Sequence, residues 1–110
     1  MNKNQKVPDI SSKEATILSV LLLRPAEELY GLQIVEASDG LLKRGTVYVI
    51  LQRMEEKRLI ESRQEERTLP EIGIPRRLYA VTGLGMRALD RYEELHTKLA
   101  RLMAIATARG

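Results

Sequence analysis

The stretch KRGTVYVILQRMEEKRLIE, from Lys43 to Glu61, decides the fold of this chain. Within it, apolar side chains recur at i, i+3, i+4 and i+7, which is the spacing of one face of a helix. A short apolar pair at residues 59 and 60 then begins an extended segment. The stretch therefore predicts an amphipathic helix followed directly by a strand. The core-facing residues of the helix are Val47, Ile50, Leu51 and Met54.

The opposite face of this helix carries side chains suited to nucleic acid. Gln52 and Arg53 can hydrogen-bond base edges, and Val49 can contact a thymine methyl group. At the helix start, Lys43 and Arg44 can hold phosphates together with the backbone N–H groups. The alternative is a plain amphipathic helix with a mixed polar face, and the helix taken alone favours that alternative. Further residues of this face are Gly45, where a backbone can come close, Thr46, which can cap the helix, and Tyr48, which flanks it.

The chain before this stretch predicts a flexible arm over residues 1–10 and two more helices. Ser11 and Glu14 have the spacing of a capping box, with Ile10 placed to pack on the first turn of the first helix. That helix ends before Pro25, because the residue before proline is steered out of the helical region. The second helix is expected from residue 26 or 28 to residue 38, and Gly40 is a natural stop.

The chain after the stretch predicts a hairpin. Residues 60–66 and 77–82 suit two short strands, and the segment between them is rich in turn residues, which indicates a long tip. Cations at the strand ends can reach a nucleic-acid backbone, although charges on a solvated strand edge also protect against aggregation. These cations are Arg63, Arg67, Arg76 and Arg77.

From Gly83 the chain is expected to be helical almost to its end. Apolar residues spaced four, three, four, three and four apart form a seam like that of a coiled coil. A helix of this length exceeds what so small a domain can cover, which indicates a partner helix from a second copy. A two-fold dimer would present two recognition helices about 34–36 Å apart and predicts a near-palindromic site. The expected dimerisation residues are Ala88, Leu89, Tyr92, Leu95, Leu99, Leu102, Met103 and Ala106.

Three helices followed by a two-stranded hairpin form the winged helix-turn-helix arrangement. The predicted fold is mainly α (α+β), with a two-stranded wing and a long C-terminal dimerisation helix. Its parts are a flexible arm (1–10), a DNA-binding domain (11–82) and the dimerisation helix (83–110).

Composition fits an intracellular protein and gives little support for catalysis. The 110 residues carry a net charge of +3, with the cations concentrated between residues 43 and 77. There is no cysteine, no apolar run long enough to span a membrane and no apolar core of a signal peptide. His96 is the single histidine, and no metal-ligand spacing or nucleophile motif occurs. The expectation is a cytoplasmic protein that is not an enzyme and has no metal or cofactor.

Three blocks of the chain resemble the PadR family of bacterial transcriptional regulators. They are LYGLQIVE in the second helix, RGTVYVILQRMEEKRLIES in the third, and RRLYAVTGLGMRAL before the last. The matching positions are Tyr30, Gly31, Ile34, Gly45, Thr46, Tyr48, Leu51, Arg53, Glu55, Leu59, Ile60, Arg77, Tyr79, Thr82 and Gly85.

The resemblance implies a winged-helix homodimer that represses transcription from a palindromic operator. It places Gly45, Thr46 and Tyr48 at the DNA backbone. Val49 stands where the family usually has proline, and Arg58 where it has glycine. The single terminal helix is typical of the shorter subclass, for which an effector is often unknown, and the chain has no Trp to enclose a planar ligand. The alternative is a winged-helix protein-interaction module, since glutamates dilute the charge of the wing.

Overall fold

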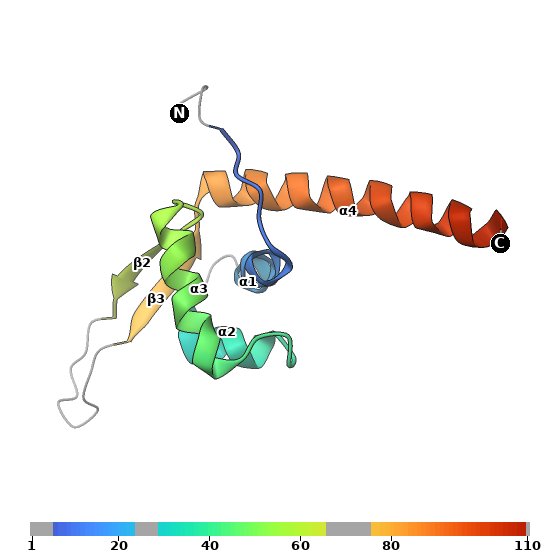
Figure 1. Cartoon of the computed structure of the whole chain (residues 1–110). Helices are drawn as coiled ribbons and strands as arrows, with labels where there is room; N and C mark the ends of the chain where they lie inside the picture. The colour runs from blue at the N-terminus through green and yellow to red at the C-terminus, as the bar shows by residue number, and fades with distance from the viewer. Residues whose placement is uncertain (1–5, 24–28, 66–75, 110) are drawn as a thin grey trace.

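The computed structural model describes residues 6–23, 29–65 and 76–109. These residues form a mainly helical winged helix-turn-helix with a small antiparallel sheet (Figure 1), as predicted. The sheet has the strand order β1-β3-β2. The elements are α1 (Ser12–Leu23), β1 (Leu29–Tyr30), α2 (Gly31–Ala37), α3 (Arg44–Glu56), β2 (Ile60–Gln64), β3 (Arg77–Val81) and α4 (Gly83–Arg109).

Helix α1 begins with the predicted capping box. The backbone N–H of Glu14 donates to the hydroxyl of Ser11 (3.1 Å), and the N–H of Ser11 donates to the carboxylate of Glu14 (2.9 Å). Both groups would otherwise be orphan donors at the helix start. The predicted arm is partly packed, because Val7 and Ile10 contact the core. Residues 1–5 lie outside the described residues.

The second helix begins later than predicted, at Gly31. Leu29 and Tyr30 form a short strand instead, pairing with Tyr79 and Leu78 of β3. The backbone N–H of Tyr30 then donates to the side chain of Gln33 (3.0 Å), which caps the helix. The sheet consequently has three strands rather than the expected two, because β1 pairs with the free edge of β3.

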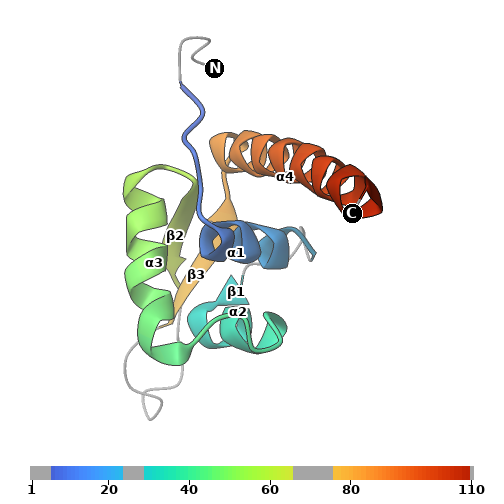
Figure 2. The ribbon, with the colours of Figure 1, turned by 45° about the vertical axis from the view of Figure 1, so that its right-hand side comes forward.

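The turn between α2 and α3 fixes the direction of the third helix. Ser38 is buried, and its hydroxyl donates to the carbonyl of Val35 (2.7 Å) and accepts from the N–H of Leu42 (3.1 Å). Asp39 and Gly40 follow with φ of 52° and 89°, the left-handed region that reverses the chain. The turn leads α3 away from α2 along the sheet (Figure 2).

The core lies between α1, α2, α3, the inner face of the sheet and the start of α4. Its largest fully buried side chains come from α1, α2 and α3 and from residues 59 and 60 at the start of β2. They are Ile17, Leu18, Ile34, Val47, Leu51, Met54, Leu59 and Ile60.

Helix α4 has a buried first turn and a long exposed remainder. Thr82 lies before the helix, and its hydroxyl accepts from the N–H of Gly85 (3.0 Å) and lies 2.6 Å from the carbonyl of Arg58. Leu84, Ala88 and Leu89 are buried, whereas the C-terminal half of the helix extends well beyond the other elements (Figure 1). Within the described ranges, no helix is long and apolar enough to cross a membrane.

Candidate nucleic-acid interface

The exposed face of α3 is the one predicted from its periodicity. Val47, Leu51 and Met54 are fully buried and fix the rotation of the helix, while Ile50 is half-buried. The opposite face is open to solvent and includes two large apolar side chains, Tyr48 (55% exposed) and Val49 (50% exposed). The other exposed side chains of this face are Arg44, Thr46, Gln52 and Arg53.

The start of α3 leaves backbone donors available. Lys43 is the N-cap residue and makes no side-chain capping hydrogen bond. The hydroxyl of Thr46, expected to cap, donates to the carbonyl of Lys43 instead (3.3 Å). The N–H of Thr46 donates to the carbonyl of Lys43 (3.1 Å), whereas the N–H groups of Arg44 and Gly45 precede the first intrahelical bond, so a phosphate can accept from them.

Tyr48 is held in place by α2. Its ring lies so close to Gly31 that a Cβ added there would be 2.7 Å from the phenol oxygen. Gly31, the first residue of α2, has no Cβ and therefore leaves room for the Tyr48 ring.

Arg76 lies directly before β3 and is the first described residue after position 75. Tyr30 pairs with Leu78, so Arg76, two residues earlier on the same strand face, comes within diagonal reach. Its guanidinium lies over the Tyr30 ring, 4.3 Å from the centroid, in a cation–π contact. Of the other expected wing cations, Arg63 is exposed on β2, and Arg67 lies outside the described residues.

Arg77 is engaged within the chain. Its guanidinium donates to the hydroxyl of Ser62 (3.0 Å and 3.2 Å), and that hydroxyl donates to the carboxylate of Glu55 (2.7 Å). The hydroxyl thus bridges a cation on β3 and an anion on α3. This chain ties the base of the wing to the third helix and fixes the distance between them.

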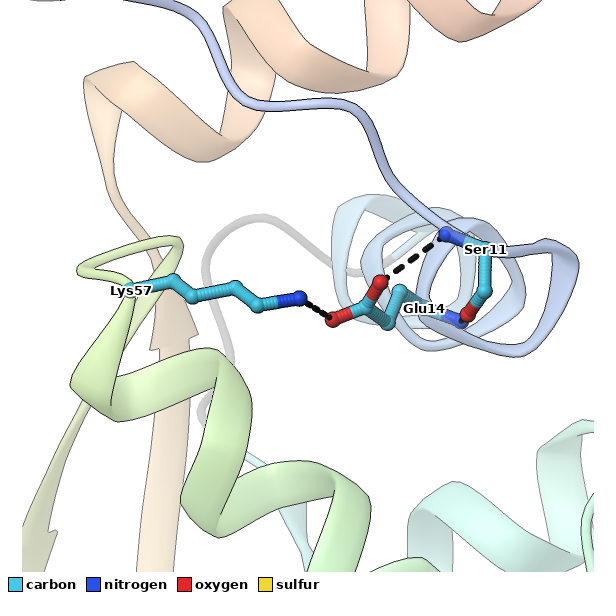
Figure 3. A network of polar contacts seen from close by, with 3 residues as sticks. All are labelled: Ser11, Glu14 and Lys57. Carbon is cyan, nitrogen blue, oxygen red and sulfur yellow. Dashed lines mark hydrogen bonds and ion pairs between the residues drawn. The ribbon is translucent and has the colours of Figure 1, made fainter.

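The opposite side of α3 is tied to α1 by an ion pair. Lys57 donates to Glu14 at 2.9 Å, and the Glu14 side chain is only 8% exposed (Figure 3). Burial raises the pKa of Glu14, but the hydrogen bonds from Lys57 and Ser11 and the charge of Lys57 outweigh it, so the pKa lies below its ordinary value. Glu14 is therefore charged at neutral pH.

The seam of α4 divides into two parts. Ala88 and Leu89 are buried in the core of their own chain, and Tyr92 is half-buried and stacks on His96 with ring centroids 3.9 Å apart. Within the described residues, the seam from residue 95 onward lies outside the hydrophobic core and keeps large apolar side chains about half exposed or more. These exposed seam residues are Leu95, Leu99, Leu102 and Met103, followed by the small Ala106.

Sequence reasoning gave no role to Ser62 or Lys57. Each acts through a residue distant in sequence, so no local motif marks it. Tyr30 belongs to the block that resembles the family, which is a signal that it has a structural or functional task.

Comparisons with protein families and solved structures find proteins of the same fold. The model of the transcriptional regulator PadR-like family matches residues 17–91. A PadR family transcription regulator from hypervirulent Clostridium difficile is 26% identical, with a TM-score of 0.73 over 88% of this chain and 99% of that one. A PadR-like transcription factor from Bacteroides fragilis is also 26% identical, with a TM-score of 0.68 over 86% and 88% of the two chains. A comparison with curated proteins found no match.

The structural class is that of winged helix-turn-helix transcription regulators. Because the family match spans more than half of the chain, the protein belongs to the PadR-like family of transcriptional regulators. MepR from Staphylococcus aureus, at 18% identity and a TM-score of 0.67 over 88% and 64% of the chains, shares the fold.

Proposed function

We propose that this protein is a homodimeric, sequence-specific DNA-binding repressor that acts in the cytoplasm on a near-palindromic operator. The observation that carries the proposal is the exposed face of α3, whose polar and apolar side chains suit base edges and thymine methyl groups. Family membership supports DNA as the partner, and the projecting seam of α4 supports the dimer.

The proposed contacts fall into two groups with different effects. Val49, Gln52 and Arg53 touch bases and determine sequence preference. The remaining contacts hold the sugar–phosphate backbone and position the duplex. The backbone group comprises Lys43, Arg44, Gly45, Thr46 and Tyr48 on α3, and Arg63, Arg67, Arg76 and Arg77 on the wing.

Selection of binding sites from a random duplex library with the purified protein tests the proposal. We expect recovery of an inverted repeat and an affinity that falls steeply with salt, because phosphate neutralisation releases counterions. Arg53→Ala is expected to relax base preference at one position of each half-site. Arg44→Ala is the matched variant and is expected to weaken all duplexes alike.

Two results would contradict the proposal. Weak, unselective binding at low salt would exclude sequence-specific recognition. A stoichiometric protein partner together with no selected site would favour the protein-interaction module instead. A reporter gene placed behind the selected site distinguishes repression from activation.

A further inference from the structure

A groove of about 450 Å³ lies beside the exposed face of α3, on the side of α1. We call it the α1–α3 groove. It runs along one edge of α3 and ends at the Lys57–Glu14 ion pair, which Figure 3 shows spanning the two helices. Its lining residues are Ser11 just before α1, Lys13 and Glu14 of α1, and Thr46, Val49, Ile50, Arg53 and Lys57 from α3 and its C-terminal end.

The charge of this groove is positive. Among the described residues that line it, Lys13, Arg53 and Lys57 are cations and Glu14 is the one acid. Both carboxylate oxygens of Glu14 are already engaged, one with the Ser11 N–H and the other with Lys57, each at 2.9 Å. The internal ion pair leaves the charges of Lys13 and Arg53 for a ligand.

The groove adjoins the residues proposed to read bases. Val49 and Arg53 line it and also belong to the exposed face of α3. A helix in a major groove about 12 Å wide has a sugar–phosphate backbone on each side. Tyr48 lies on the edge of α3 next to α2, so the second backbone passes along the opposite edge, where the α1–α3 groove lies.

We infer that the α1–α3 groove holds a phosphate of the bound duplex. In this groove Lys13 contacts the phosphate from α1, an element that is neither the recognition helix nor the wing. The inference rests on the proposed DNA-binding function. Lys13 adds one charge-assisted contact to the backbone group and places α1 against the DNA. Because a phosphate carries no sequence information, the contact contributes equally to every duplex.

The test compares Lys13→Gln with Lys98→Gln, which removes the same charge from the polar side of α4. Dissociation constants are measured at several salt concentrations for two probes, the duplex recovered by selection and a scrambled duplex of equal length. For Lys13→Gln we expect weaker binding to both probes by the same factor, and a log–log salt slope smaller by about 1.8, because each of the two protomers loses one phosphate contact. Lys13→Arg, which keeps the charge, is expected to retain the slope, and Lys98→Gln is expected to match the unmodified protein.

The outcomes separate the inference from the function on which it rests. If the unmodified protein selects no duplex, the proposed function fails. If it selects one and Lys13→Gln keeps the full salt slope, the function stands and the groove contact is excluded. A loss of affinity confined to the selected duplex would also overturn the inference, because it would show Lys13 reading bases rather than a phosphate.

Discussion

Arg58 holds a backbone conformation that favours glycine. Its φ is 64°, directly after the end of α3. The N–H of Arg58 donates to the Glu55 carbonyl (3.0 Å), and that of Leu59 to the Met54 carbonyl (2.9 Å), the paired bonds of a Schellman ending. The glycine that the family resemblance implies at this position would adopt this conformation without strain.

Replacement of Arg58 by glycine is therefore expected to stabilise the fold. The gain is about 1 kcal/mol in the free energy of unfolding, because glycine has no Cβ to crowd the left-handed conformation. Arg58→Ala is the matched control, since it removes the side chain but keeps the Cβ. Urea unfolding measures both, and equal midpoints for the two variants would contradict the explanation.

The side chain of Glu14 makes the free energy of unfolding depend on pH. Its pKa is lowered in the folded protein, so the unfolded chain binds the proton more tightly. The contribution of Glu14 to stability is fully present above the ordinary pKa of the unfolded chain's carboxyl and is lost as the pH falls through the lower folded pKa.

Glu14→Gln is expected to reduce this acid dependence. At neutral pH it should cost about 1–2 kcal/mol, because Lys57 loses its partner while staying partly exposed to solvent. Stability curves measured between pH 3 and pH 7 check this, with the exposed Glu93→Gln as the control for a lost negative charge. A curve for Glu14→Gln parallel to that of the unmodified protein would exclude the linkage.

At the scale of elements, the helices with strong local signals were predictable. The capping box begins α1 and the i, i+3, i+4 spacing orients α3, and both depend on residues within a few positions of each other. Strand β1 was not predictable, because its two residues are strand only through pairing with β3 about fifty positions later. That pairing also moved the start of α2 and brought Tyr30 beneath Arg76.

The candidate site likewise has a part that the sequence predicts and a part that only the structure shows. The outward orientation of Val49, Gln52 and Arg53 could be predicted from helical periodicity alone. The Glu55–Ser62–Arg77 chain could not, because it joins three elements whose relative placement only the folded chain defines. Sequence therefore predicts which side chains face outward, and the structure adds what holds them there.

The junction of α4 with β2 depends on Gly85. A Cβ at this position would collide with the backbone carbonyl of Leu59, which cannot move without breaking the bond between that carbonyl and the N–H of Thr82 (3.1 Å). At Gly83 a Cβ would meet only the guanidinium of Arg87, at 3.6 Å.

The two glycines are therefore expected to respond in opposite ways to alanine. Gly85→Ala should destabilise the fold by roughly 1–3 kcal/mol, because the helix must shift away from the strand. Gly83→Ala should be neutral or stabilising by up to about 1 kcal/mol, since alanine favours the helix. Thermal unfolding of both variants measures the difference, and a Gly85→Ala variant as stable as Gly83→Ala would contradict the close packing.

At the scale of the whole molecule, the C-terminal half of α4 carries an apolar seam that the rest of the described chain leaves exposed. The described chain extends 63 × 36 × 24 Å, and its C-terminal helix projects beyond the globular part (Figure 1). The arm and the start of α4 are already joined, by the Arg91–Asp9 ion pair at 3.5 Å and the packing of Ile10. A second copy is thus expected to meet the distal seam rather than residues 88 and 89.

A charge placed in the distal seam is expected to separate the dimer. Leu99→Glu puts a carboxylate on the apolar face, where a partner helix would have to bury it without compensation. Thr97→Glu is the matched control, because it adds the same charge on the polar side of α4. Sedimentation at several protein concentrations should show a monomer for Leu99→Glu and a dimer for Thr97→Glu.

The monomer should also lose most of its affinity for an inverted repeat, while the isolated half-site is bound as before, because two linked recognition helices bind with a high effective concentration. A dimer that survives Leu99→Glu would place the partner elsewhere on the molecule and remove the basis for a two-fold operator.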